Sequence, residues 1–422
     1  MQIVIISLFV FFIILGFILS IFDVIGASIY DIKELKRLKR NKSRYANYHP
    51  LVSIIIPAFN EEEVIKRCLE STMRIDYPHL EVIVSDDASV DKTSKIVREF
   101  IKNYHGKINF ELLTNRKNRG RGGTINNAIK RKSNGELIMA LDADCVVDTQ
   151  SIKNAVRYFS DPSLAALAAN VSTLPHASIL GVLQQFEWVS AFRSKKLNTI
   201  LNCEYIIGGA GAMYRKSVIK KLSYFNESML TEDISLSLSI ASLGNKEYRL
   251  HYASDVSVYT EHVPDYSGLF KQRYRWKLGS LQALFAHKFL IFSRDKKYTR
   301  TLTFFRLPMV LWGEFMLVLE PLFITYFIFL AIVLNTPIIF IIGWLGATIM
   351  FFFALWGDDR LERYQKFRLT VFLPVMYMLY YILSFIQIFA VYKSIRHYKK
   401  INGSDLMRGA WNHPKRIAAT AK

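Results

Sequence analysis

The apolar residues of this 422-residue chain are concentrated in two regions that flank a more polar middle. Residues 1–30 are almost uncharged, residues 31–300 have the composition of a globular enzyme, and residues 308–392 are again dominated by apolar side chains. A soluble protein does not segregate its apolar residues in this way. The pattern therefore predicts membrane-spanning segments on both sides of a soluble domain.

Four apolar segments are candidates for membrane-spanning helices, at residues 3–22, 304–334, 338–356 and 369–392. The first lacks the basic region and small-residue cleavage site of a signal peptide, so we expect it to remain as an anchor. Cations follow it directly, which predicts an outer N-terminus and a cytoplasmic middle domain. They are Lys33, Lys36, Arg37, Lys39, Arg40, Lys42 and Arg44.

The net charge of +20 is concentrated beside the apolar segments, and the C-terminal tail adds a second basic cluster. Such clusters mark the cytoplasmic side and attract anionic lipids, so the expected partner is the lipid bilayer and no nucleic acid. Four spans after an outer N-terminus would place the basic tail outside, against the charge rule. Either one segment is re-entrant or interfacial, or a short span is miscounted.

Short β-branched runs alternate with helical patterns between the apolar regions. Strands are predicted at 52–57, 80–84, 110–113 and 137–141, and helices at 62–73, 92–104 and 123–132. This alternation predicts an α/β domain with a doubly wound, mostly parallel sheet that binds ligands at the carboxyl ends of its strands. The predicted divisions are an N-terminal membrane helix (1–30), a basic linker (31–50), a cytoplasmic domain (51–262), interfacial helices (263–303), about three C-terminal membrane helices (304–392) and a basic tail (393–422).

Acidic pairs follow two of the predicted strands. Asp142 and Asp144 lie two positions apart, on the same side of an extended chain, which suits a divalent cation held between the protein and a nucleotide diphosphate. Asp86 and Asp87 follow the second strand, where we expect them to contact a nucleobase and to add negative charge near the cation. Capping of the next helix is the alternative for this second pair.

Two other loops are candidates for nucleotide contacts. Asn60 and Glu61 follow the first strand, where hydrogen bonding to a base and helix capping are both open. The glycine-rich segment 118–123 leads into a predicted helix, whose N-terminus attracts phosphate. Arg121 and Asn126 are the side chains expected to contact the nucleotide there, and a flexible basic turn is the alternative.

Three later motifs suit transfer chemistry. Thr231-Glu232-Asp233 offers a general base, with helix capping as the alternative. The glycines around residues 208–213 allow close backbone approach of an acceptor, through Gly209, Ala210 and Gly211. Gln272-Arg273-Tyr274-Arg275-Trp276 combines cations that bind phosphate oxygens with an indole that can stack on a flat sugar face.

In this order and spacing, Asp86-Asp87, Asp142-Ala143-Asp144, Thr231-Glu232-Asp233 and the segment 272–276 resemble the motifs of the membrane-bound processive family 2 glycosyltransferases. That group includes cellulose, chitin, hyaluronan and poly-N-acetylglucosamine synthases. The resemblance extends over about residues 51–290. Segments 230–234 and 269–273 are most similar to the poly-N-acetylglucosamine synthases, and the Gly-Asp-Asp sequence usual in hyaluronan synthases is absent.

The resemblance implies a glycosyltransferase A-type α/β domain inserted between transmembrane helices of the cell membrane. It implies Asp233 as the base, with Glu232 beside it, and Mg²⁺ or Mn²⁺ held by Asp142 and Asp144. The implied nucleotide-sugar site comprises Ala58, Asn60, Glu61, Asp86, Asp87, Arg121, Asn126, Asp142, Ala143, Asp144, Gln272, Arg275 and Trp276. The implied acceptor site comprises Trp276, Gly209, Ala210 and Gly211.

The implied reaction is processive, inverting transfer from a UDP-sugar, best matched by UDP-GlcNAc, to a growing β-linked polysaccharide that is exported across the membrane. A small membrane accessory subunit is a further implied partner. One alternative is a non-processive membrane glycosyltransferase that acts on a lipid or short acceptor, although such enzymes generally lack the motif at 272–276. Another is a hyaluronan- or cellulose-type synthase that uses a different UDP-sugar.

Overall fold

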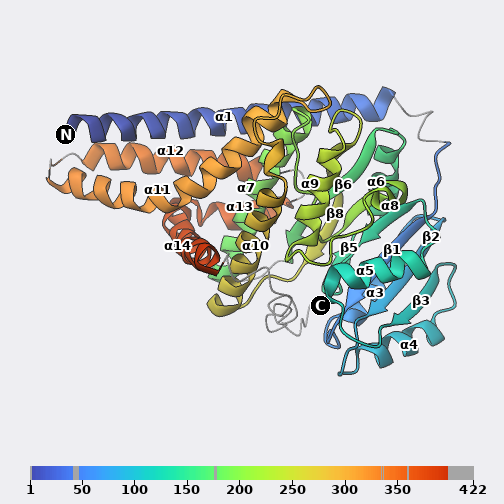
Figure 1. Cartoon of the computed structure of the whole chain (residues 1–422). Helices are drawn as coiled ribbons and strands as arrows, with labels where there is room; N and C mark the ends of the chain where they lie inside the picture. Colours follow the sequence, from blue (N-terminus) through green and yellow to red (C-terminus); the bar gives the residue numbers. More distant parts are fainter. Residues whose placement is uncertain are drawn as a thin grey trace.

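The computed structural model describes residues 2–40, 47–174, 178–333, 335, 337–358 and 361–397. Part of the predicted linker (41–46) and most of the predicted basic tail (398–422) therefore lie outside the described residues. An α/β domain contains an eight-stranded sheet, and long helices project from one side of this domain (Figure 1).

The sheet has the strand order β3-β2-β1-β4-β7-β6-β8-β5. Its strands are β1 (Val52–Ala58), β2 (Leu80–Asp86), β3 (Asn109–Thr114), β4 (Leu137–Ala140), β5 (Val146–Val147), β6 (Leu164–Thr173), β7 (Ala212–Arg215) and β8 (Arg249–Thr260). The domain helices are α3 (Ile65–Met73), α4 (Thr93–Asn103), α5 (Gly120–Arg131), α6 (Ser151–Phe159), α7 (Ile179–Ile200), α8 (Lys216–Lys221) and α9 (Glu232–Ser242).

The remaining helices lie at the two ends of the chain. They are α1 (Gln2–Arg40), α10 (Tyr266–Ala286), α11 (Leu307–Val333), α12 (Pro337–Trp356), α13 (Arg363–Thr370) and α14 (Leu373–His397). A short 3-10 helix (Lys288–Leu290) follows α10, and a π-helical turn (Thr301–Arg306) leads into α11.

The sheet is mixed but mostly parallel, as predicted, because β3, β2, β1, β4, β6 and β8 share one direction and only β7 and β5 oppose it. β3, β2, β1 and β4 run parallel, whereas β7 lies antiparallel between β4 and β6. The cause is the glycine-rich turn before β7. Gly211, the residue before β7, adopts a φ of +70°. Its N–H donates to the carbonyl of Ala140, the last residue of β4, at 2.8 Å. A strand that starts at the carboxyl end of β4 must run back along it.

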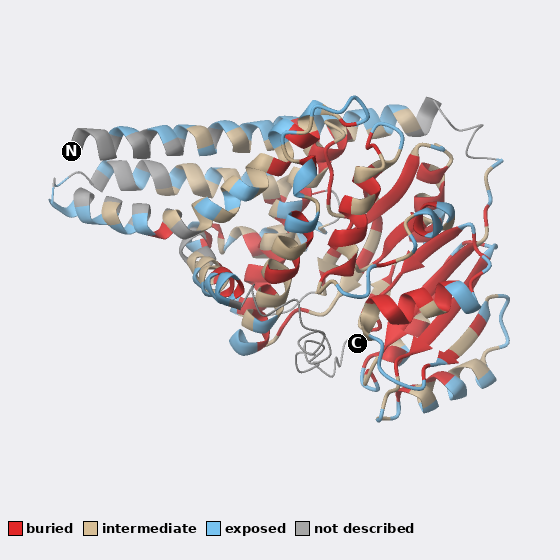
Figure 2. Ribbon diagram, viewed as in Figure 1, coloured by how far each residue is buried: buried red, intermediate tan, exposed pale blue. Residues whose placement is uncertain are grey.

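Helices cover both faces of the sheet, which explains the unbroken β-branched runs in the sequence. Successive residues of a strand point to opposite faces, so Ile54 and Ile56 pack in one core cluster and Ile55 in another. Figure 2 shows the buried residues concentrated in this sheet and the helices on it, while the projecting helices carry many exposed residues.

Helix α1 is longer than the predicted span, and its second half packs on the domain. A Cβ atom on Gly26 would overlap the side chain of Leu197 in α7. The Tyr30 hydroxyl donates to the carbonyl of Tyr252 in β8 at 2.8 Å, and Lys196 pairs with Asp31 at 2.6 Å. Residues 31–40 thus continue the helix, and these contacts fix its direction relative to the sheet.

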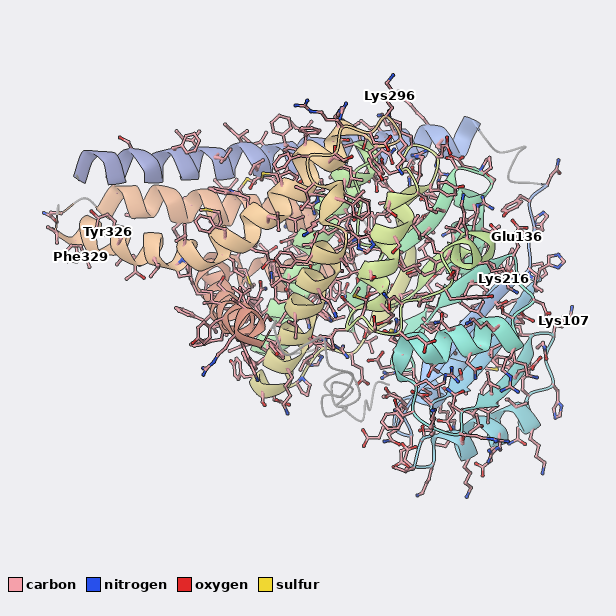
Figure 3. All side chains as sticks on the ribbon, viewed as in Figure 1. Lys107, Glu136, Lys216, Lys296, Tyr326 and Phe329 are labelled. Atoms are coloured by element: carbon pink, nitrogen blue, oxygen red, sulfur yellow. The ribbon has the colours of Figure 1, made fainter. Side chains whose placement is uncertain are left out.

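The three C-terminal segments predicted as spans form α11, α12 and α14. Among the described residues, two helical stretches are long and apolar enough to cross a membrane, Ile14–Arg37 and Leu373–Arg396. Exposed Phe11, Phe315 and Ile341 on the projecting helices are side chains that a bilayer would cover. Tyr326 and Phe329 of α11 lie at the opposite end of the molecule from Glu136 (Figure 3). The number of spans and the side of the domain remain predictions.

Candidate active site

The predicted acidic pairs lie at one edge of the sheet. Asp86 is the last residue of β2 and is in register with Ala58, the last residue of β1. Asp142 follows β4, which is parallel to β1, by two residues. Because parallel strands end at the same edge, both acidic pairs face the edge at which α/β sheets bind ligands.

Arg121, in the first turn of α5, joins three of the predicted motifs. Its Nη2 lies 2.6 Å from Oδ1 of Asp142, and its Nη1 pairs with Glu232. Nη2 also donates to the carbonyl of Gly209 at 2.9 Å. One guanidinium thus connects the predicted metal motif at 142–144, the predicted base motif at 231–233 and the glycine-rich loop at 208–213. A planar group with five N–H donors suits such a junction.

Asp233 lies beside this junction. A methyl group at Gly209 would lie 3.2 Å from Oδ2 of Asp233 and 3.0 Å from Nη2 of Arg121, so the glycine gives both groups room to approach the loop. Burial, reinforced by the negative charge of Glu232 and opposed by Arg121, raises the pKa of Asp233 to about 6. A carboxylate with this pKa is ionised at neutral pH and is a stronger base than an ordinary aspartate.

This pKa predicts the acidic limb of the pH profile. Only ionised Asp233 can accept a proton, so kcat/KM should fall as the pH drops below about 6, by about tenfold per unit. The profile should be recorded at subsaturating donor, because kcat/KM reports the free enzyme. An acidic limb that stays near pH 4 would show that Asp233 retains the pKa of an exposed aspartate or is not the base.

Asp142, Asp144 and Cys145 form the acidic group best suited to a cation among the described residues. One donor atom from each lies within 4.8 Å of the others. Both carboxylates are partly exposed, and oxygen donors of this kind fit Mg²⁺ or Mn²⁺. Burial raises the pKa of the Cys145 thiol well above its ordinary value, so it stays protonated and is no ligand for a hard cation. Asp142 and Asp144 therefore fit the predicted metal.

Chelation tests this fit. If a divalent cation bound by Asp142 and Asp144 neutralises the diphosphate, EDTA should abolish transfer and excess Mg²⁺ or Mn²⁺ should restore it. The assay is release of UDP by purified enzyme before chelation, after chelation and after metal addition. Full turnover in EDTA would contradict the metal role of this pair.

Asp86 and Asp87 are buried and bonded to neighbouring loops. Asp87 accepts from the backbone N–H groups of Arg119 and Gly120, at 2.9 and 3.0 Å. Asp86 accepts from the Ser94 hydroxyl at 2.6 Å. These bonds hold the loop before α5 and the start of α4 at the edge of the sheet. Contact of either residue with a nucleotide remains a prediction.

The other predicted nucleotide residues also support the loops of this edge. Asn60 has a φ of +55° and accepts from Val90 N–H at 2.9 Å. Asn126 exchanges two hydrogen bonds with the backbone of Phe225, at 2.8 and 3.0 Å, and so ties α5 to the chain before the base motif. The three other predicted residues, Ala58, Glu61 and Ala143, are buried.

Helix α10 carries the motif at 272–276 and docks on the base motif. A Cβ atom on Gly279 would lie 2.5 Å from Thr231, the residue before α9. Gln282 accepts from Leu230 N–H at 3.1 Å. The partly exposed Gln272, Arg275 and Trp276 lie within two turns of Gly279.

Glu187 and Trp188 of α7 were not predicted as site residues, and Arg273 was grouped with Arg275 as a cation that binds phosphate oxygens. Arg273 is 2% exposed, pairs with Glu187 and lies over the Trp276 ring, 4.2 Å from its centroid. The Trp188 and Trp276 rings meet edge to face at 6.2 Å. The available signal was a lone carboxylate in an otherwise uncharged run, 179–192, which requires a cationic partner when it is buried.

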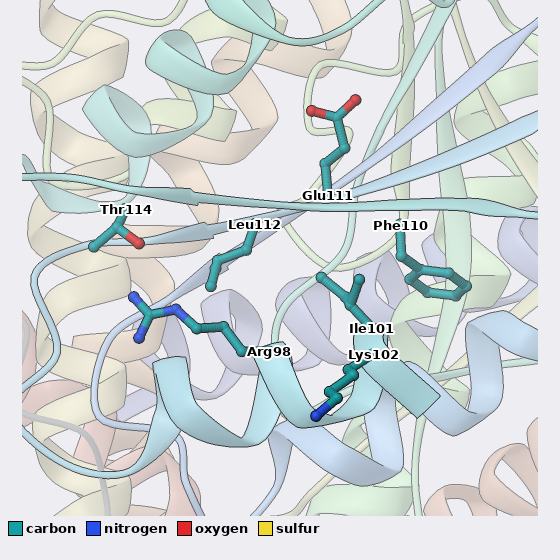
Figure 4. Close-up of a pocket in the computed structure, with 7 residues that line it drawn as sticks. All are labelled: Arg98, Ile101, Lys102, Phe110, Glu111, Leu112 and Thr114. Atoms are coloured by element: carbon teal, nitrogen blue, oxygen red, sulfur yellow. The ribbon is translucent and has the colours of Figure 1, made fainter. Parts of the chain in front are cut away.

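An open hollow lies away from these motifs, between α4 and the terminal strand β3. It has a volume of about 520 Å³ and is lined by Arg98, Ile101, Lys102, Phe110, Glu111, Leu112 and Thr114 (Figure 4). None of these is a predicted site residue. The candidate site is therefore defined by its converging side chains and not by this hollow.

Residues 53–223 match the family described as Glycosyl transferase family 2. The poly-beta-1,6-N-acetyl-D-glucosamine synthase of Staphylococcus epidermidis is 30% identical over 274 residues, 63% of this chain and 64% of the relative. The synthase of Staphylococcus aureus strain COL is 27% identical over 298 residues, 70% of each chain. The alignment thus spans slightly less than two thirds of the Staphylococcus epidermidis relative.

The fold is shared with a solved structure. It is the mannosyltransferase PcManGT from Pyrobaculum calidifontis, solved in complex with GDP-Man and Mn²⁺. The TM-score is 0.56 at 19% identity, over 90% of this chain and 98% of that chain. At this identity the similarity concerns the path of the backbone.

Proposed function

Because residues 53–223 match Glycosyl transferase family 2, we propose that this chain transfers N-acetylglucosamine from UDP-GlcNAc to a growing β-linked polysaccharide. Transfer is processive and inverting, and the product is exported across the cell membrane in which the enzyme is anchored. The catalytic domain faces the cytoplasm, where the nucleotide-sugar is available. The synthase relatives support the sugar and the polymeric product.

Asp233 is the general base of the proposed reaction. It takes the proton from a hydroxyl of the acceptor's terminal sugar as that oxygen bonds to the anomeric carbon of the donor. The bond from this carbon to the diphosphate breaks in the same displacement, so an α-linked donor gives a β-linked product and UDP leaves. Gly209 lies next to Asp233, where a glycine lets the acceptor come close.

Three other groups hold the donor. Asp142 and Asp144 would bind Mg²⁺ or Mn²⁺, which when present neutralises the charge of the leaving diphosphate. Arg121 keeps the Asp142 carboxylate oriented, and Arg275 of α10 is a further cation for the diphosphate. The proposal rests on the contacts of the Arg121 guanidinium with Asp142, Glu232 and the carbonyl of Gly209. These contacts bring together the segments proposed to bind the donor, to carry the base and to bind the acceptor.

Trp276 provides the platform for the acceptor's terminal sugar. Its helix also contacts the apolar C-terminal helices, because Lys277 pairs with Glu314 of α11 at 2.6 Å and Lys393 of α14 lies over the Tyr274 ring, 4.8 Å from its centroid. A platform between the base and these helices supports export of a chain that stays bound between additions.

The donor is tested by offering purified enzyme labelled UDP-GlcNAc, UDP-glucose and UDP-glucuronate in separate reactions and sizing the products. We expect label in a long product only with UDP-GlcNAc. Incorporation with UDP-glucose or UDP-glucuronate alone would refute the proposed donor. Single-sugar adducts with UDP-GlcNAc would refute processivity and leave the donor assignment intact.

A further inference from the structure

We infer that Glu187 of α7 is a positioning residue that acts through Arg273 to hold the Trp276 ring in place as the acceptor platform. The inference rests on the proposed function, because the platform has meaning only if a sugar chain is extended there. Glu187 lies on a different helix from the platform and pairs with the arginine that covers it.

The contacts form a short chain from α7 to α10. Glu187 pairs with Nη2 of Arg273, and Nη1 of the same guanidinium donates to Oε1 of Gln272 at 3.0 Å. The guanidinium carbon lies 4.2 Å from the centroid of the Trp276 ring, so Arg273 covers one face of the indole. Glu187 therefore determines where the guanidinium lies, and the guanidinium determines the orientation of the ring.

A second contact restrains the same ring from its edge. Trp188 meets Trp276 at 6.2 Å with an interplanar angle of 73°, and it stacks on Phe192 at 5.7 Å. Phe192 in turn stacks on Tyr252 of β8 at 5.3 Å. The platform is thus held by α7 at two points, and this aromatic row connects it to the sheet.

The ion pair is better suited to orientation than to stability. Arg273 is 2% exposed, and its Nε has no hydrogen-bond partner among the described residues. The Arg273 side chain is 3% exposed and that of Glu187 is 20% exposed, so desolvation of the guanidinium offsets much of the attraction and the pair gains little net free energy. Its specific contribution is geometric, since a planar guanidinium can bind a carboxylate at its edge while stacking on an indole.

Glu187→Gln tests the inference, because it removes the charge and keeps the shape of the side chain. With UDP-GlcNAc as donor, we expect the mean product length to fall about tenfold, the effect of losing one charge-assisted hydrogen bond. The KM for UDP-GlcNAc should stay unchanged. In a Trp276→Ala background, Glu187→Gln should shorten the product no further. Glu136→Gln, which amidates the carboxylate paired with Arg215, is the matched control and should leave length unchanged.

A double variant covers the case in which unpaired Arg273 prevents folding. Glu187→Leu with Arg273→Met replaces the buried pair by apolar side chains, an exchange that is often neutral or stabilising. This variant should fold and still make short product. Restoration of full length would show that the pair has only a structural role and would overturn the inference. So would wild-type length in Glu187→Gln. Absence of polymer from the wild-type enzyme would instead count against the proposed function.

Discussion

Asp233→Asn is expected to slow polymer synthesis by about 10²- to 10⁴-fold, the usual contribution of general base catalysis. The amide has nearly the same shape as the carboxylate but cannot accept the acceptor's proton. The groups proposed to hold the donor, Asp142, Asp144 and Arg121, remain, so UDP binding should stay measurable. The readouts are UDP release from UDP-GlcNAc and UDP affinity by titration calorimetry.

Asp255→Asn is the matched control, because it amidates another partly buried aspartate, which accepts from Tyr158 Oη at 2.7 Å. This variant should retain transfer even if its stability changes. Transfer at the wild-type rate in Asp233→Asn would remove the base assignment. Equal losses in both variants would point to a general effect of amidation on folding.

Arg121→Met should have the second large effect. It leaves Asp142 and Glu232 without their shared cation, and the loss of the partner of the buried Glu232 carboxylate costs about 3–5 kcal/mol of the free energy of unfolding. Arg121 also lowers the pKa of Asp233, so its removal should raise that pKa above about 6. In the surviving folded enzyme, kcat/KM should be reduced and its acidic limb should move to higher pH.

Arg215→Met separates this effect from simple destabilisation. Arg215 also makes several hydrogen bonds, but it lies at the opposite end of the sheet, in register with the first residue of β4. Its loss should lower the midpoint of thermal unfolding and leave the pH profile in place. If Arg121→Met left the acidic limb where it is in the wild type, the proposed coupling between Arg121 and Asp233 would be incorrect.

Much of the fold could be predicted because its signals are local. The β-branched runs that form β1, β2 and β4 and the helical patterns between them are visible in single segments. The direction of β7, in contrast, could not be predicted from a local signal. It depends on Gly211 N–H reaching the carbonyl of Ala140, a contact between residues 71 positions apart. The motif order predicted a family 2 glycosyltransferase domain, and residues 53–223 match that family.

The sequence motifs suggested which residues belong to the candidate site, but not which of these residues contact one another. Short motifs mark Asp142, Asp233 and Trp276 because their chemistry is tied to residue type and local spacing. The pairing of Arg121 with Glu232 joins residues 111 positions apart, and that of Arg273 with Glu187 joins residues 86 positions apart. Such pairs are set by the packing of α5 on α9 and of α7 near α10, which no local pattern encodes.

The most direct test of the account is the structure of the product made by purified, membrane-embedded enzyme from UDP-GlcNAc as the sole donor. The product should be sized by chromatography, and its anomeric configuration should be read by NMR. We predict a long, exclusively β-linked polymer of N-acetylglucosamine. An α-linked product, or a single sugar added to a lipid or short acceptor, would contradict the account.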